Sequence, residues 1–284
     1  MDYLERIVEF ALEEDTAFGD ITSELTVPAG RDASGIFLAK SDGVISGLSV
    51  VAEVFHQVDP TVRFAPLLND GDRVSRGEKL AVVSGSARSI LRGERVALNF
   101  LQRLSGVATS TARYVEATRD TDARIIDTRK TTPGMRVLEK AAVRHGGGHN
   151  HRIGLGDGIL IKDNHLAAIG GPERIAIAVR AARKGAPHTL RVEVEVASLE
   201  ELEQALAVRP DTILLDNMSV EEMAEAVRRT AARALLEASG GITLESVRAV
   251  AQTGVNLISV GALTHSSRAL DISLELDLGN EMDS

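Results

Sequence analysis

The chain lacks cysteine and tryptophan, and only 3% of its residues are aromatic. Without cysteine it can form no disulfide, no Cys-ligated zinc site and no thiol nucleophile. Few aromatic rings means few platforms on which bases could stack. The formal net charge of −9 further disfavours nucleic acid as a partner.

Long apolar runs are also missing, because no stretch of eighteen or more apolar residues occurs. We therefore expect no transmembrane helix and no membrane partner. Residues 1–15 mix acidic and basic residues with Leu and Val, which predicts an amphipathic helix and not a signal peptide. A cytoplasmic location is expected. A length of 284 residues suits a barrel with a smaller companion domain.

Positive charge is concentrated in one segment of this acidic chain. Residues 129–165 contain seven Lys and Arg against three acidic residues, and four of the seven histidines. A basic, His-rich segment in an otherwise acidic protein indicates a focused pocket for a small anion.

The first hundred residues predict a small sheet domain. Residues 1–30 look helical and then turn-like, and short, partly alternating apolar runs follow at 34–39, 43–50 and 79–84. Turns rich in Gly, Asp and Ser separate these runs, as is typical of short strands. Residues 89–118 predict a long helix with a break near Ser105-Gly106.

From about residue 120, apolar β-branched runs alternate with helical segments, which predicts βα units and a parallel sheet. The predicted strands are 124–127, 158–162, 190–195, 212–216, 234–238 and 257–260. Nearly every one ends in polar residues or glycines. Active sites of βα barrels lie at the carboxyl ends of the strands, so the pattern favours a complete or incomplete barrel.

Two glycine-containing strand ends predict a phosphate site. Ser239-Gly240-Gly241 follows one strand and precedes a helix expected near Thr243, and Gly261 follows the next strand. Glycines let backbone N–H groups approach an anion, and a helix N-terminus favours phosphate. The alternative is a pair of tight turns without a ligand.

Charged residues at other strand ends predict further contacts. Glu195 and Asp216 could hold Mg²⁺, which takes one or two protein carboxylates plus substrate phosphates, or could simply form ion pairs. The cationic set can clamp carboxylates and phosphates; it consists of Arg129, Lys130, His151, Arg152 and Lys162. A metal site on His149 and His151 is disfavoured by their spacing.

Together these segments resemble the quinolinate phosphoribosyltransferase family. The motifs are Asp-Thr-Arg-Lys-Thr-Thr-Pro-Gly at 127–134, Leu-Glu-Lys at 138–140, Gly-Gly-Gly-His-Asn-His-Arg at 146–152 and Leu-Ile-Lys-Asp-Asn-His at 160–165. Shorter matches lie at 14–15, 19–22, 94–99, 214–217, 237–241 and 261–265. The resemblance runs in order over nearly the whole chain.

The resemblance implies an α/β fold with two domains. An N-terminal α/β sandwich domain would span 1–108 and be joined by the C-terminal tail 269–284, and an incomplete α/β barrel of the type II phosphoribosyltransferases would span 109–268. It also implies a homodimer in which Arg95 of one subunit completes the active site of the other. Whether dimers pair further into hexamers is left open.

The implied reaction transfers phosphoribosyl from phosphoribosyl pyrophosphate to quinolinate, with decarboxylation, in NAD biosynthesis, and Mg²⁺ is the implied cofactor. The catalytic residues would be Lys130, Lys162, Glu195 and Asp216, with the last two as metal ligands. The full set of substrate-binding residues would be Arg95, Thr128, Arg129, Lys130, His151, Arg152, Lys162, Glu195, Asp216, Ser239, Gly240, Gly241, Gly261 and His265.

The resemblance also implies which residues of that set bind which part of the substrates. Arg95, Arg129, His151 and Arg152 would hold the two carboxylates of quinolinate. Lys130 and Lys162 would neutralise the pyrophosphate, and Glu195 and Asp216 would bind Mg²⁺ or the ribose hydroxyls. The 5′-phosphate would lie against the remaining strand-end residues, Ser239, Gly240, Gly241, Gly261 and His265.

Three other functions compete. A divergent relative could use another pyridine acid or belong to a molybdenum transport system. A Schiff-base aldolase would also have a strand-end lysine, such as Lys162, and a phosphate site in a barrel. A non-enzymatic protein could bind phosphoribosyl pyrophosphate without releasing pyrophosphate.

Overall fold

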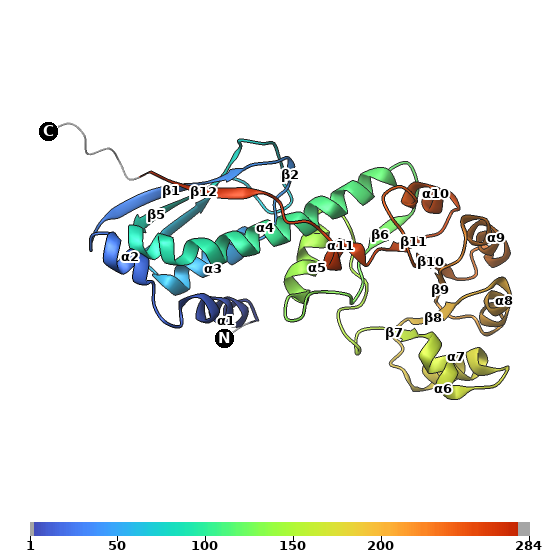
Figure 1. The fold of residues 1–284 in the computed structure, drawn as a ribbon. Helices are drawn as coiled ribbons and strands as arrows, with labels where there is room; N and C mark the ends of the chain where they lie inside the picture. Colours follow the sequence, from blue (N-terminus) through green and yellow to red (C-terminus); the bar gives the residue numbers. More distant parts are fainter. Residues whose placement is uncertain (1–2, 278–284) are drawn as a thin grey trace. The chain divides into compact units, whose positions relative to one another are not determined.

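The structure is a computed structural model that describes residues 3–277 (Figure 1). Its chain forms two compact units, the first of residues 1–110, 132–147 and 266–284 and the second of residues 111–131 and 148–265. The predicted first domain and its tail include residues 1–2 and 278–284, which lie outside the described residues. No helix of the described part is long and apolar enough to cross a membrane.

The first unit is built on a four-stranded antiparallel sheet with the order β12-β1-β5-β3. These strands are β1 (Asp32–Ala39), β3 (Arg63–Pro66), β5 (Lys79–Ser86) and β12 (Ile272–Asp277). A second small sheet pairs β2 (Gly43–Val44) with β4 (Arg73–Val74). The accompanying helices are α1 (Tyr3–Thr16), α2 (Ile21–Thr26), α3 (Leu48–Val58), α4 (Ala87–Ala117) and α5 (Arg136–His145). In Figure 1 the red strand β12 lies beside β1, although 232 residues of chain lie between the end of β1 at Ala39 and the start of β12 at Ile272.

The apolar run predicted as a strand over 43–50 is mostly not a strand, and this prediction was wrong. Only β2 is extended, and α3 begins at Leu48. The buried residues of α3 recur at the spacing of one helix face: Leu48, Val50, Val51, Val54 and Phe55. That helical period outweighs the β propensity of the valines, because the face packs into the core, where Phe55 meets Phe37 and Phe64.

Helix α4 is continuous through Ser105-Gly106, so the predicted break was also wrong. Gly106 serves another purpose, since a Cβ added there would overlap the backbone carbonyl of Arg268 and press on Ala269. The missing side chain therefore lets the chain that leads to β12 cross close to the helix. A glycine within a helix weakens it, and this close approach is the compensating gain.

The second unit is a six-stranded parallel sheet with the order β6-β11-β10-β9-β8-β7. Its strands are β6 (Arg124–Ile126), β7 (Ile159–Ile161), β8 (Val192–Val196), β9 (Thr212–Asp216), β10 (Leu235–Ser239) and β11 (Leu257–Ser259). Its helices are α6 (Asp163–Ile169), α7 (Arg174–Gly185), α8 (Leu199–Val208), α9 (Val220–Thr230), α10 (Val247–Gln252) and α11 (Ala262–His265). The alternation of strand and helix confirms the predicted α/β class with a parallel sheet. The two edge strands, β6 and β7, do not pair with each other in the described part of the chain, so the barrel is incomplete.

Successive side chains of these strands face alternately an apolar side and a polar side of the sheet. On β8, Val192, Val194 and Val196 are buried apolar residues, whereas Glu193 and Glu195 line cavities. The same period of two brings the other strands' polar residues to the interior. Parallel pairing sets Glu195 beside Leu214, and Leu214 beside Glu237, which aligns the strand ends.

Gly106→Ala is expected to lower the free energy of unfolding by about 1–3 kcal/mol, because the new methyl group forces the backbone near Arg268 to move. Gly185→Ala is the matched control, since it is also helical but has no neighbouring atom within 4 Å of an added Cβ. The control should be neutral or about 0.5 kcal/mol more stable. Urea unfolding of both variants measures this, and equal stabilities would contradict the close-packing argument.

Candidate active site

A polar cavity of about 570 Å³ lies at the carboxyl ends of the parallel strands in the second unit. Every strand contributes to it, either from its last residues or from the loop that follows. Its walls are formed by Thr128, Arg129, Lys130, His151, Arg152, Leu160, Lys162, Asp163, Glu195, Leu214, Asp216, Asn217, Glu237, Ser239, Gly240, Gly241 and Ser259. This is the edge at which sites of barrel enzymes are found.

All but three of the residues proposed from the sequence line this cavity. Arg95 is one exception, being exposed on α4 of the first unit. Gly261 and His265 are the others, yet they lie against a lining residue. A Cβ added to Gly261 would stand 3.1 Å from His265 Nε2 and 3.2 Å from Lys130 Cδ. The absence of a side chain at Gly261 thus lets the His265 imidazole and the Lys130 side chain both lie close to this position.

Two arginines, Arg129 and Arg152, lie close together in the wall of the cavity. Burial lowers the pKa of Arg152, and the neighbouring positive charge of Arg129 lowers it further. The Arg152 guanidinium is held in place because its Nη1 donates to the Gly158 carbonyl at 3.0 Å. A bound anion would relieve the repulsion between the two guanidinium groups, so the arrangement favours a carboxylate or phosphate ligand.

Asp127 holds the loop that carries His151 and Arg152, a role that the sequence did not reveal. Its side chain is fully buried at the end of β6. It accepts hydrogen bonds from Asn150 Nδ2 at 2.6 Å and from the His151 backbone N–H at 2.8 Å. A buried carboxylate with such donors fixes the backbone around it. The only signal in the sequence was its place at the head of the 127–134 motif.

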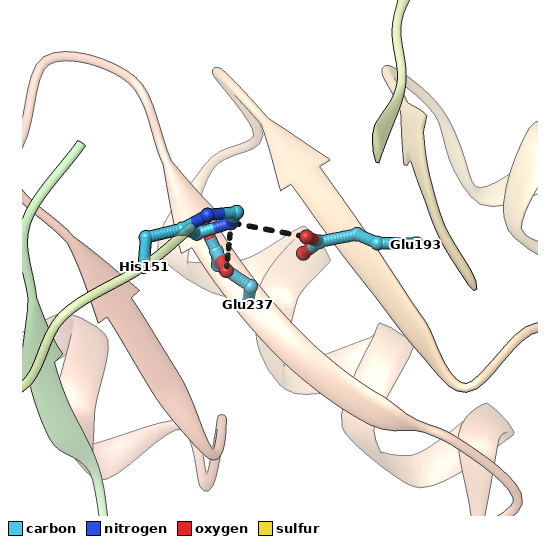
Figure 2. A group of neighbouring side chains, drawn as sticks. All are labelled: His151, Glu193 and Glu237. Atoms are coloured by element: carbon cyan, nitrogen blue, oxygen red, sulfur yellow. Dashed lines mark hydrogen bonds and ion pairs between the residues drawn. The ribbon is translucent and has the colours of Figure 1, made fainter. Parts of the chain in front are cut away.

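His151 lies between two buried glutamates, Glu193 and Glu237 (Figure 2). Its Nε2 is 3.0 Å from Glu193 Oε2 and 3.5 Å from Glu237 Oε2. Its Nδ1 accepts the Arg152 backbone N–H at 2.7 Å, which leaves the proton of a neutral ring on Nε2, facing the carboxylates. Both nitrogens therefore face protein groups, and a direct contact of His151 with a substrate carboxylate stays a prediction.

Neither glutamate was among the predicted residues. Burial raises the pKa of Glu237 well above its usual range, and the charge of Glu193 raises it further. A hydrogen bond to Ser259 and the positive charge of Lys162 act in the opposite direction. Two carboxyl groups can share a hydrogen bond only when one is protonated, and the raised pKa of Glu237 favours the proton on that residue.

The ligand atoms of these three side chains lie within 4.8 Å of one another. Hydrogen bonds account for that closeness without a cation. Mg²⁺ prefers oxygen ligands, and the better match for it is the pair of strand-end carboxylates. Glu195 and Asp216 both line the cavity, where Glu195 Oε2 is 3.0 Å from Lys162 Nζ and Asp216 accepts from Asn217 Nδ2 at 2.8 Å.

The glycine loop after β10 is shaped by its contact with Asn217. Gly240 has a φ of +98°, and an added Cβ would overlap the Asn217 side-chain oxygen. Asn217 itself donates its backbone N–H to the Ser239 carbonyl at 2.9 Å. The helix expected near Thr243 begins instead at Val247, because residues 243–246 form a turn in which Ser246 Oγ accepts from the Thr243 N–H. A helix dipole at Gly241 therefore does not support the phosphate prediction, which depends on the loop alone.

A second cavity of about 350 Å³ opens at the amino ends of the same strands. Arg124, Arg191 and Thr212 lie on its walls, as does Glu193. It shares His151, Arg152 and Glu237 with the first cavity. These three residues thus form the partition between the two ends of the sheet.

Comparison with known proteins covers both units. Residues 20–105 match the family model described as quinolinate phosphoribosyl transferase, N-terminal domain, and residues 107–275 match that of the C-terminal domain. The chain is 48% identical to the nicotinate-nucleotide pyrophosphorylase [carboxylating] of Mycobacterium leprae, over 94% of each chain. It is 45% identical to the probable enzyme of that name from Bacillus subtilis, covering 98% of this chain and 95% of the relative.

The fold matches solved structures equally well. The nicotinate-nucleotide pyrophosphorylase of Francisella tularensis superimposes with a TM-score of 0.91 at 40% identity, covering 97% of this chain and 96% of that one. The order of elements, and not only the motifs, is therefore similar along the whole chain.

Gly240→Ala is expected to weaken binding of inorganic phosphate at least about tenfold, because strain of about 1–2 kcal/mol at positive φ is joined by displacement of Asn217. Gly171→Ala is the matched control, with a φ of +77° but no atom within 4 Å of the added Cβ. It should be destabilised without a change in phosphate affinity. Calorimetric titration distinguishes them, and unchanged affinity in Gly240→Ala would refute a role of this loop in anion binding.

Proposed function

We infer that the chain, which belongs to the quinolinate phosphoribosyltransferase family, transfers phosphoribosyl from phosphoribosyl pyrophosphate to quinolinate. The products are nicotinate mononucleotide, pyrophosphate and CO₂, and the reaction serves NAD biosynthesis. The relatives' names describe the same reaction written in reverse, as a carboxylating pyrophosphorylase. Family membership decides against the aldolase and the non-enzymatic binding protein.

The observation that supports this function is the convergence of cations from separate strands on one cavity. Arg129 and Lys130 follow β6, Arg152 precedes β7, and Lys162 follows it. Quinolinate carries two carboxylates and the sugar substrate carries a pyrophosphate and a 5′-phosphate, so the ligands bring enough negative charge to balance this set. We assign the carboxylates to Arg129, Arg152 and His151, together with Arg95 of the partner subunit.

The sugar phosphates would lie on the other side of the cavity. Lys130 and Lys162 neutralise the pyrophosphate, and the loop at Ser239, Gly240 and Gly241 receives the 5′-phosphate. His265, which lies beside Gly261, would also contact the 5′-phosphate. Backbone N–H groups and small residues suit this phosphate, because it stays on the product and needs only to be held.

Glu195 and Asp216 would hold Mg²⁺, or bind the ribose hydroxyls. Both are hard oxygen ligands on neighbouring strands of one cavity, as the ion requires. When bound, Mg²⁺ supplies positive charge to the leaving pyrophosphate. The pairing of Lys162 with Glu195 keeps the lysine beside these carboxylates.

Catalysis is then a matter of position and charge. The ring nitrogen of quinolinate attacks C1 of the ribose as pyrophosphate departs, and the lysines stabilise the charge that develops on the leaving group. No protein nucleophile is needed. The alkylated nitrogen carries a positive charge, which lets the ring hold the electron pair left at C2 when CO₂ departs.

The direct test is an assay of purified protein with phosphoribosyl pyrophosphate, Mg²⁺ and either quinolinate or nicotinate. Nicotinate mononucleotide and CO₂ should form from quinolinate, and nicotinate should be a poor acceptor because it lacks one carboxylate. Product from nicotinate alone would point to a divergent acceptor. The cytoplasmic location expected from the sequence stays a prediction.

Lys130→Ala and Lys162→Ala are each expected to lower kcat about 10²–10³-fold, as loss of a preorganised charge at a developing anion does. Lys184→Ala is the control, because Lys184 is an exposed lysine at the end of α7. All three variants should keep the parent melting temperature within the spread expected for surface substitutions. Near-normal turnover in both active-site variants would remove the lysines from the mechanism.

The proposed homodimer with shared sites predicts complementation. Arg95→Ala and Lys162→Ala should each be nearly inactive alone, since Arg95 belongs to the first unit and Lys162 to the second. After the two variants are unfolded and refolded together, mixed dimers should contain one intact site and recover activity. If the mixture stays as inactive as its components, Arg95 does not act across a subunit boundary.

A further inference from the structure

Decarboxylation leaves an electron pair on C2 of the ring, and a proton must replace the lost carboxylate. None of the roles assigned above supplies that proton. The partition between the two cavities contains Glu237, a buried carboxyl group whose raised pKa favours the protonated form.

The geometry at Glu237 keeps a proton close to the substrate cavity. The side chain is only 2% exposed and extends from the middle of β10. His151 Nε2 lies between Glu193 Oε2 at 3.0 Å and Glu237 Oε2 at 3.5 Å (Figure 2). Glu193 also shares a hydrogen bond with Glu237, and its charge is one of the causes that raise the pKa of Glu237.

The second cavity gives Glu237 access to solvent from the other end of the sheet. Glu237 lines both cavities, whereas Lys162 and Ser259 line only the first and Glu193 only the second. Water in the second cavity can therefore reach this carboxyl group without crossing bound substrate.

We propose that Glu237 is the general acid that protonates C2 after CO₂ leaves, and that the second cavity is the route by which its proton is replaced. The proposal rests on the proposed function and adds the proton donor to it. In the step, the C2–carboxylate bond breaks and its electron pair stays on C2. That pair then takes the proton from the Glu237 carboxyl, which becomes a carboxylate. A proton from water in the second cavity restores Glu237, so the cycle consumes one proton and no oxidant or reductant.

Other groups at the cavity are less suited to the step. The ring proton of His151 faces Glu193 and not the cavity. Arg129 and Arg152 do not release protons at physiological pH. Lys162 is paired with Glu195. Burial and the charge of Glu193 raise the pKa of Glu237, which favours the protonated form that a donor needs.

Glu237→Gln tests the role, because an amide matches the shape of a protonated carboxyl and keeps its hydrogen bonds but cannot give up a proton. Pyrophosphate and CO₂ are followed separately with quinolinate as acceptor. We expect pyrophosphate release in the first turnover to stay within a few-fold of the parent. Until C2 is protonated its electron pair can recapture CO₂, so net CO₂ release should fall about 100-fold, as loss of a general acid does, and quinolinate mononucleotide should accumulate. Glu203→Gln, an exposed glutamate on α8, is the matched control.

Two outcomes would overturn the proposal. If CO₂ release keeps pace with pyrophosphate release in Glu237→Gln, the proton comes from elsewhere. If both fall together with quinolinate affinity, Glu237 is only structural. Absence of product from the parent protein would instead mean that the proposed function is wrong, so the two failures are distinguishable.

A second measurement needs no variant and covers the case in which Glu237→Gln does not fold. In the parent protein, the ratio of CO₂ to pyrophosphate released in one turnover should fall as the pH rises through the raised pKa of Glu237. The groups that face Glu237 are Glu193 on β8, His151 in the loop before β7, Lys162 after β7 and Ser259 on β11, and all but His151 shift its pKa. A ratio independent of pH up to the alkaline limit of stability would overturn the proposal.

Discussion

The interior of the second unit carries charged groups where a barrel usually carries aliphatic side chains, and each buried charge must be balanced by another. Glu193 faces His151, Glu195 faces Lys162, and Asp127 accepts hydrogen bonds from the loop that holds Arg152. Removing one partner of a pair in which both groups are largely buried, as in His151–Glu193, leaves an uncompensated charge, which is strongly destabilising. This mutual dependence fixes the site's geometry more firmly than packing alone would.

The protein's own groups do not balance all of the positive charge at the site. Arg129 and Arg152 repel each other, and burial makes that repulsion stronger. A bound anionic substrate would balance the two guanidinium charges. Part of the binding energy then comes from charges that the protein already holds in place, away from water. Beside Arg152, in the partition between the two cavities, the negative charge of Glu193 raises the pKa of Glu237 and favours a proton there. The interior thus combines arginines that favour an anion with a carboxyl group that favours a proton.

Much of this could be predicted from the sequence, because strand ends carry their chemistry locally. Lys162, Asp216 and Ser239 each stand at the end of an apolar run that predicts a strand. The parallel sheet brings these three residues to one cavity. Glu193 and Glu237 could not be found this way, since they lie within strands that read as buried and their pairing with His151 depends on the register of β8 and β10. Helix α3 and the close approach at Gly106 likewise depend on tertiary packing, which local propensity does not contain.

The measurement that tests this account most directly is a crystal structure of the protein with quinolinate bound. The account predicts the pyridine ring in the cavity at the carboxyl ends of the strands, with its carboxylates within hydrogen-bonding distance of Arg129 and Arg152 and its C2 edge towards Glu237. Quinolinate bound in the second cavity, or held in the first without contact to either arginine, would contradict it.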